Sequence, residues 1–110
     1  MKNRILLIED EGELLANVGD LLELEGYTVL KAASGEEGIQ LAEATLPDLI
    51  VCDILMPGVD GYGVLKTLRN SPATADIPFI FLTARTRAAD VRSGMERGAD
   101  DYVTKPFSGE

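Results

Sequence analysis

The sequence predicts an α/β fold, a doubly wound five-stranded parallel sheet with helices on both faces. Short apolar runs alternate with amphipathic segments along the 110 residues, and the connections between them are short. Strands that alternate with helices in this way form parallel sheets with right-handed crossovers. With 45% apolar residues, the chain can bury one core. We therefore expect a single domain over residues 1–110.

Each element follows from a local pattern. The expected strands cover residues 4–8, 28–32, 49–53, 78–83 and 101–104, and the expected helices cover residues 12–25, 35–45, 61–70 and 87–97. The first helix has an apolar stripe from Leu14 to Leu22 at spacings of three and four, and Gly26 ends it. Ser34 and Glu37 resemble a capping box at the start of the second helix.

The predicted strand order is the flavodoxin-like order 2-1-3-4-5, whose switch point lies between the first and third strands. The sequence ends soon after the fifth strand, so the last helix is apparently missing. A single remaining helix would leave apolar strand surface exposed on one face of the sheet. We expect that the domain is truncated before its C-terminal helix, or that a partner chain covers this face.

Charge and composition exclude several classes of protein. The formal net charge of -9 repels phosphate backbones, so direct nucleic-acid binding is not expected and would need a separate output domain. The sequence contains neither a membrane span nor a signal peptide, which predicts a cytoplasmic location and no membrane partner. Cys52 is the single cysteine, and its apolar surroundings predict a buried thiol.

Reactive side chains follow four of the expected strands. Glu9 and Asp10 follow the first strand, Asp53 ends the third, Thr83 ends the fourth, and Lys105 follows the fifth. Ligands of open parallel sheets bind outside the carboxyl ends of the strands, at the switch point. We therefore expect Glu9, Asp10 and Asp53 to converge.

Converging carboxylates repel one another, and a hard cation such as Mg²⁺ would relieve this cost. An alternative for the first group is that Glu9, Asp10 and Glu11 favour the positive end of the helix that follows them. This alternative stays open for those acids, but it does not explain Asp53.

A carboxylate exposed beside a cation can act as a nucleophile toward phosphorus and form an aspartyl-phosphate. Asp53 would be that nucleophile, Lys105 would supply an ammonium, and Thr83 would donate a hydrogen bond to a phosphoryl oxygen. Taken singly, Thr83 is better explained as a helix N-cap and Lys105 as a solvated lysine. Their joint placement favours the phosphoryl chemistry.

With these residues in place, the whole chain resembles the response regulator receiver domain of two-component signalling. The matching residues, in order, are Glu9-Asp10, Asp53, Met56-Pro57-Gly58, Asp60-Gly61, Thr83-Ala84, Gly98-Ala99-Asp100-Asp101-Tyr102 and Lys105-Pro106-Phe107. No single motif is specific, but the ordered set is.

The resemblance implies that Asp53 accepts a phosphoryl group from a histidine kinase or a phosphotransfer protein. It implies that Glu9, Asp10 and Asp53 bind Mg²⁺ together with the main-chain carbonyl of Leu55. It also implies a switch in which Thr83 moves toward the phosphate and Tyr102 turns inward. The alternative for Tyr102 is an ordinary half-buried strand aromatic.

The resemblance also implies partners and a phosphate lifetime. The sequence contains no histidine, so the phosphodonor must act in trans. The fourth helix and fifth strand would form a surface for output and homodimerisation, with an output domain in a longer parent chain. Leu55 and Arg85 occupy positions that tune phosphate loss in relatives, and neither is suited to position water. We expect slow self-dephosphorylation of a signalling domain that is not otherwise an enzyme.

Three other functions would require different residues or only the fold. A haloacid-dehalogenase-type hydrolase would place a second acid at the position of Leu55. A flavin-binding module would need a phosphate-binding loop where Glu9, Asp10 and Glu11 stand, and these acids repel phosphate. A static interaction module with the same fold stays open, because the helix expected after the fifth strand is absent.

Overall fold

The computed structural model describes residues 3–83 and 101–104, and its elements follow the predicted order. They are β1 (Arg4–Ile8), α1 (Gly12–Leu24), β2 (Thr28–Ala32), α2 (Gly35–Thr45), β3 (Leu49–Asp53), α3 (Gly61–Arg69), β4 (Phe79–Thr83) and β5 (Asp101–Thr104). Every one of these elements agrees with its predicted boundaries to within one residue. The helix predicted over residues 87–97 lies outside the described residues.

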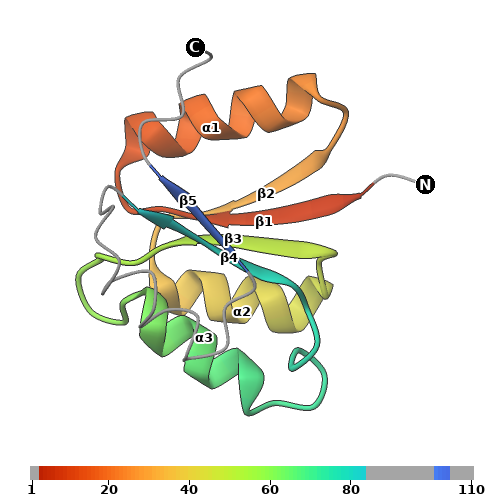
Figure 1. Cartoon of the computed structure of the whole chain (residues 1–110), viewed down its shortest axis with the longest axis vertical. Helices are drawn as coiled ribbons and strands as arrows, with labels where there is room; N and C mark the ends of the chain where they lie inside the picture. The colour runs from red at the N-terminus through yellow and green to blue at the C-terminus, as the bar shows by residue number, and fades with distance from the viewer. Residues whose placement is uncertain (1–2, 84–100, 105–110) are drawn as a thin grey trace.

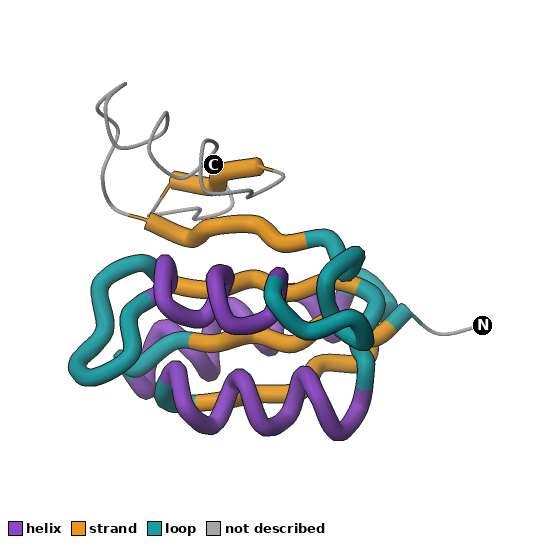
Figure 2. The backbone as a smooth tube through the Cα atoms, turned by 90° about the horizontal axis from the view of Figure 1, so that it is seen from below, coloured by secondary structure: helices purple, strands orange, loops and turns teal. Residues whose placement is uncertain are grey.

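The strands form one parallel sheet in the order β2-β1-β3-β4-β5, which confirms the predicted doubly wound fold. Figure 2 shows the five strands side by side in this order. The order reverses between β1 and β3, so the carboxyl ends of these two strands flank the switch point. Side chains of successive strand residues point to opposite faces, and this alternation divides the core in two.

One face of the sheet is covered by α2 and α3 (Figure 1). On this face Leu6 and Ile8 of β1 pack with Ile50 and Cys52 of β3, and all four are fully buried. The continuous apolar strands predicted from the sequence are therefore explained by burial on both sides. We call this face the α2/α3 face.

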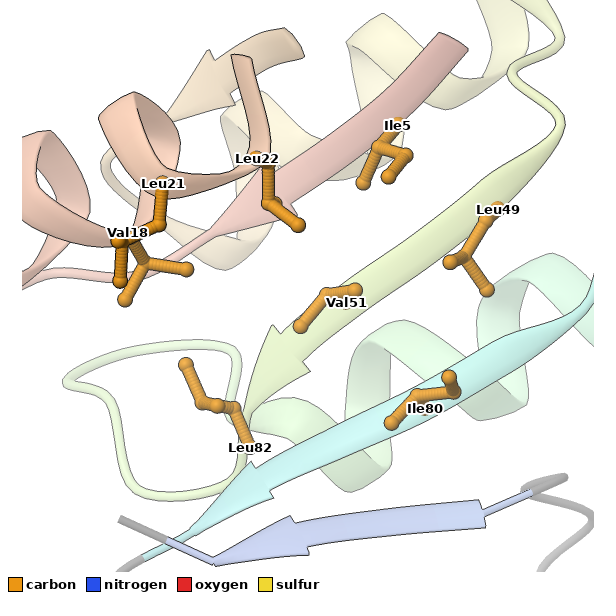
Figure 3. A pocket seen from close by; sticks show the side chains of 8 residues that line it. All are labelled: Ile5, Val18, Leu21, Leu22, Leu49, Val51, Ile80 and Leu82. Atoms are coloured by element: carbon orange, nitrogen blue, oxygen red, sulfur yellow. The ribbon is translucent and has the colours of Figure 1, made fainter. Parts of the chain in front are cut away.

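The opposite face, which we call the α1 face, carries Ile5, Leu7 and Val51 against the apolar stripe of α1 (Figure 1). Here the packing is incomplete within the part of the chain that the structure describes. A cavity of about 310 Å³ opens between α1 and the strands, as Figure 3 shows. It is lined only by apolar side chains, namely Ile5, Val18, Leu21, Leu22, Leu49, Val51, Ile80 and Leu82. Leu21, which belongs to the predicted apolar stripe, remains 47% exposed at its edge.

The helix termini follow the predicted capping chemistry in part. Gly26 has a φ of 98°, the left-handed conformation expected after the end of α1. The Ser34 hydroxyl accepts a hydrogen bond from the Glu37 amide at 3.1 Å, as predicted. The Glu37 carboxylate, however, accepts from the Ala33 amide at 2.8 Å, one residue before the position that a capping box uses. An Asp60 cap on α3, bonded to the Gly63 amide at 2.9 Å, was not predicted.

Candidate functional site

Strand register brings Glu9 and Asp53 to the same level of the sheet. Ile8 of β1 lies opposite Cys52 of β3 in the parallel pairing, so the next residues of the two strands, Glu9 and Asp53, are also neighbours. The Glu9 amide still bonds to the Ala32 carbonyl at 3.0 Å, which extends the β1 pairing by one residue. The position of both acids is thus fixed by the sheet itself.

The predicted convergence of the three carboxylates is confirmed. Single carboxylate oxygens of Glu9, Asp10 and Asp53 all lie within 4.8 Å of one another. Glu9 is 1% exposed and Asp53 is 6% exposed, whereas Asp10 is open to solvent. Two buried acids and one exposed acid therefore form a cluster, which we call the acidic pocket.

Main-chain amides hold the two buried carboxylates in place. The Asp53 carboxylate accepts a hydrogen bond from the Ile54 amide at 2.9 Å. The Glu9 carboxylate accepts one from the Glu11 amide at 3.0 Å. Glu11 is the residue that precedes α1, so Glu9 serves the start of this helix in addition to lining the pocket. The alternative that these acids favour the positive end of the following helix is therefore correct in part. It leaves the buried Asp53 unexplained.

The donor set fits a hard divalent cation. Two carboxylate charges at such separations repel each other by on the order of 3 kcal/mol at an effective dielectric constant of about 20. All three side chains offer carboxylate oxygens, the ligand type that Mg²⁺ prefers, and Asp10 is exposed to the water from which Mg²⁺ draws its remaining ligands. The role of these acids as ligands stays a prediction.

The segment after Asp53 is anchored on both sides of Leu55. Ile54 is 3% exposed and Met56 is 8% exposed, whereas the Leu55 side chain between them is 58% exposed. The Ile54 carbonyl accepts a hydrogen bond from the Gly61 amide at 2.8 Å. These contacts fix the backbone on either side of Leu55, whose carbonyl is the predicted fourth protein ligand.

A glycine at the start of α3 lets the helix approach Asp53 closely. A Cβ atom added to Gly61 would lie 2.3 Å from the Asp53 carbonyl oxygen and 2.8 Å from the Ile54 Cα. No side chain can be accommodated at these distances, since both atoms belong to the backbone. Asp60-Gly61 is among the residues that resemble the family, but only the structure explains why glycine is required at position 61.

The thiol of Cys52 lies directly before Asp53 and takes no part in the pocket. It is fully buried on the α2/α3 face, as predicted. Burial raises the pKa of this thiol well above its usual value, and the negative charges of Asp53, Glu9 and Asp60 raise it further. The thiol therefore stays neutral and unreactive at physiological pH.

Of the remaining predicted residues, Thr83 lies at the same sheet edge, Tyr102 lies within β5, and the others lie outside the described residues. Thr83 is the last residue of β4, one position beyond the Leu82 that pairs with Asp53. Thr104 pairs with Thr83, and Tyr102 lies in β5 opposite Phe81. Lys105, Ala84 and Arg85 lie outside the described residues, as does most of the predicted output surface.

Comparison with known proteins agrees with this geometry. A family model described as the response regulator receiver domain matches residues 5–110. The chain belongs to the response regulator receiver domain family. Receiver domains are signalling domains of two-component systems, so the predicted fold, family and signalling class are confirmed.

Individual relatives cover nearly the whole chain. The transcriptional regulatory protein AfsQ1 of Streptomyces coelicolor is 45% identical over 96% of this chain and 45% of its own length. The DNA-binding dual master transcriptional regulator RpaA of Synechocystis is 45% identical over 97% of this chain and 44% of its own length. A putative response regulator from Chloroflexus aurantiacus has a similar structure, with a TM-score of 0.92, 38% identity, and coverage of 98% of this chain and 88% of that one.

The chain therefore spans less than half the length of the curated relatives it matches. None of the helices α1, α2 and α3 has the length and hydropathy that a membrane span requires.

Proposed function

We propose that this receiver domain accepts a phosphoryl group on Asp53 in an Mg²⁺-dependent reaction, with a phosphohistidine of a kinase or phosphotransfer protein as donor. The observation that carries the proposal is the convergence of the Glu9, Asp10 and Asp53 carboxylates at the switch point of a receiver fold. Family membership supports the choice of phosphoryl transfer over hydrolase or flavin chemistry.

Glu9, Asp10, Asp53 and the main-chain carbonyl of Leu55 would hold the ion. When bound, Mg²⁺ would neutralise negative charge on the transferring phosphoryl group. An Asp53 carboxylate oxygen forms the new bond to phosphorus, and the bond from phosphorus to the donor's imidazole nitrogen breaks. The electron pair of that bond stays on the imidazole, which can take a proton from water. The Ile54 amide keeps the other Asp53 oxygen fixed during attack.

Thr83 and Lys105 would bind the phosphoryl oxygens, and Thr83 with Tyr102 would form the switch. The end of β4 lies one residue beyond the level of Asp53, within the same sheet edge, which supports a role for Thr83 near the new charge. Such a switch is a two-state element biased by a local change in charge.

The named relatives support a proposal about the partners of this domain. AfsQ1 and RpaA are named as transcriptional regulators, so we propose that this receiver works beside an output domain in a longer protein, located in the cytoplasm. The net charge of -9 supports DNA contact by the output domain rather than by this one. The surface of the fourth helix and β5 would carry output and homodimer contacts.

Intact-mass spectrometry tests the central step. The protein is incubated with a small phosphodonor such as acetyl phosphate, with and without Mg²⁺, alongside Asp53→Asn. Asp20→Asn is the matched control, because it removes an exposed acid of α1. We expect one phosphoryl adduct that requires Mg²⁺, persists in Asp20→Asn and disappears in Asp53→Asn. An adduct retained in Asp53→Asn, or none in the parent, would favour another acceptor or the static interaction module.

The lifetime of the adduct tests the second part of the proposal. The exposed apolar side chain of Leu55 cannot position an attacking water by hydrogen bonding. We therefore expect the phosphorylated protein to lose its phosphate slowly in the presence of Mg²⁺. A half-life of only seconds would contradict this expectation.

A further inference from the structure

Two glycines of α2 pack closely against segments that adjoin the acidic pocket. Gly35 is the first residue of α2, and Gly38 lies one turn further along the same side of the helix. A Cβ atom on Gly38 would lie 2.4 Å from the Cδ1 atom of Ile8, the residue before Glu9. A Cβ atom on Gly35 would lie 2.3 Å from the carbonyl oxygen of Val59, in the loop that follows Asp53.

The contact of Gly35 is made with backbone and cannot be relieved by a rotamer change. Besides the Val59 carbonyl oxygen, the added Cβ would meet the Val59 Cβ at 3.0 Å and the carbonyl carbon at 3.1 Å. Gly35 is not among the described glycines with positive φ, so its conformation is open to other residues. Glycine is therefore needed at position 35 for close approach and not for a turn.

Two hydrogen bonds and a contact with the loop fix the start of α2. The Ser34 hydroxyl and the Glu37 carboxylate bond to main-chain amides at this end, at 3.1 Å and 2.8 Å. The Glu36 carboxylate lies beside Gly58, which adopts a φ of 73° in the same loop. Residues 58 and 59 of the loop thus rest on the first turn of α2.

The loop after Asp53 contains the backbone groups that the acidic pocket uses. It begins at Ile54, whose amide holds the Asp53 carboxylate, and it includes the Leu55 carbonyl. Mg²⁺ demands near-ideal octahedral geometry, whereas Ca²⁺ accepts variable geometry and longer bonds. A displacement of several tenths of an ångström in this loop would therefore affect Mg²⁺ more than Ca²⁺.

We propose that Gly35 is a positioning residue for the metal: by admitting the Val59 carbonyl against the start of α2, it sets the loop geometry that favours Mg²⁺ at the acidic pocket. The inference rests on the proposed Mg²⁺ function of that pocket. Supporting residues outside the ligand shell commonly change metal affinity by about 10-fold or more.

The test is calorimetric titration of the whole chain with Mg²⁺ and, separately, with Ca²⁺. We expect Gly35→Ala to weaken Mg²⁺ binding by about tenfold and Ca²⁺ binding by clearly less. Gly12→Ala is the matched control, because Gly12 is the first residue of α1 at the same edge of the sheet and an added Cβ would meet nothing within 4 Å. Its affinities for both ions should equal those of the parent.

The selectivity separates positioning from general destabilisation, which would lower both affinities equally. If Gly35→Ala fails to fold, Gly63→Ala presses more gently on the same residue, because its added Cβ would lie 3.0 Å from the Val59 Cγ1 atom, and a smaller Mg²⁺-selective loss is expected. Equal losses of both ions, or unchanged Mg²⁺ binding in a folded variant, would overturn the inference. If the parent binds neither ion, or Asp53→Asn binds Mg²⁺ as the parent does, the proposed function itself fails.

Discussion

Among residues 3–83 and 101–104, the two faces of the sheet differ in how completely they are packed. On the α2/α3 face, buried aromatic and aliphatic side chains from strands and two helices interlock, and Phe81 packs edge-on against both Phe79 and Tyr62 with ring centroids 5.2 Å apart. On the α1 face, α1 covers part of the strands and a cavity of about 310 Å³ remains beside it. The loop after Asp53 rests on the α2/α3 face, so the pocket is supported from the better packed side.

The backbone around Asp53 is held mainly from the α2/α3 face. The α2/α3 face contributes Ile54, Met56, Gly61 and the start of α2, all of which hold the backbone around Asp53. The α1 face contributes the turn from Glu9 to Glu11. Substitutions that probe one face against the other should therefore differ in their effect, and we give three pairs from the largest expected effect to the smallest.

The first pair consists of neighbours in β4 that point to opposite faces. Phe81→Ala removes a fully buried ring from the α2/α3 face and should lower the free energy of unfolding by about 3–5 kcal/mol. Ile80→Ala removes a half-buried side chain that lines the cavity and should cost about 1–2 kcal/mol. Urea denaturation measures both, and equal losses would mean that the faces are packed equally well.

The second pair consists of buried glycines in helices. In Gly38→Ala the new Cβ overlaps the buried Ile8 side chain, so we expect a loss of about 1–3 kcal/mol. In Gly19→Ala the Cβ meets the end of the exposed Lys31 side chain, which can move aside. The gain in helix propensity should then stabilise the protein by up to about 1 kcal/mol. Thermal unfolding of both variants measures these changes in stability. Stabilisation by Gly38→Ala would contradict the tighter packing of the α2/α3 face.

The third pair tests the helix caps. Asp60→Ala removes the carboxylate that caps α3 and should cost about 1 kcal/mol. Glu11 occupies the same position before α1 but makes no side-chain capping bond, so Glu11→Ala should change stability by less than about 0.5 kcal/mol. Denaturant midpoints with an unchanged slope report these differences. A larger effect at Glu11 would show that the start of α1 depends on this side chain.

Much of this structure could be predicted from local patterns. Alternating apolar runs and short loops predicted the parallel sheet, and the flavodoxin-like strand order then predicted that Glu9, Asp10 and Asp53 converge, because parallel strands end at one edge. The cap at Ser34 and the turn at Gly26 depend on neighbours within four residues, so the sequence contains all the information needed.

Other features depend on segments that meet only after folding. The contacts of Gly35 with Val59 and of Gly38 with Ile8 join residues whose proximity follows from the sheet order and helix packing. The exposure of Leu21 could not be read from its helical spacing, since that spacing assigns a side but not what covers it. The dual role of Glu9 was left open for the same reason, and the structure assigns it to both the helix start and the pocket.

The order of the elements along the chain also has an evolutionary consequence. The acids proposed to bind metal lie in the turn after β1 and at the end of β3, whereas Thr83 and Tyr102, proposed to respond to phosphorylation, lie in β4 and β5. Helix α3 separates the two groups along the chain. A single genetic crossover within α3 would therefore exchange the responding half between related genes and leave the metal-binding half intact.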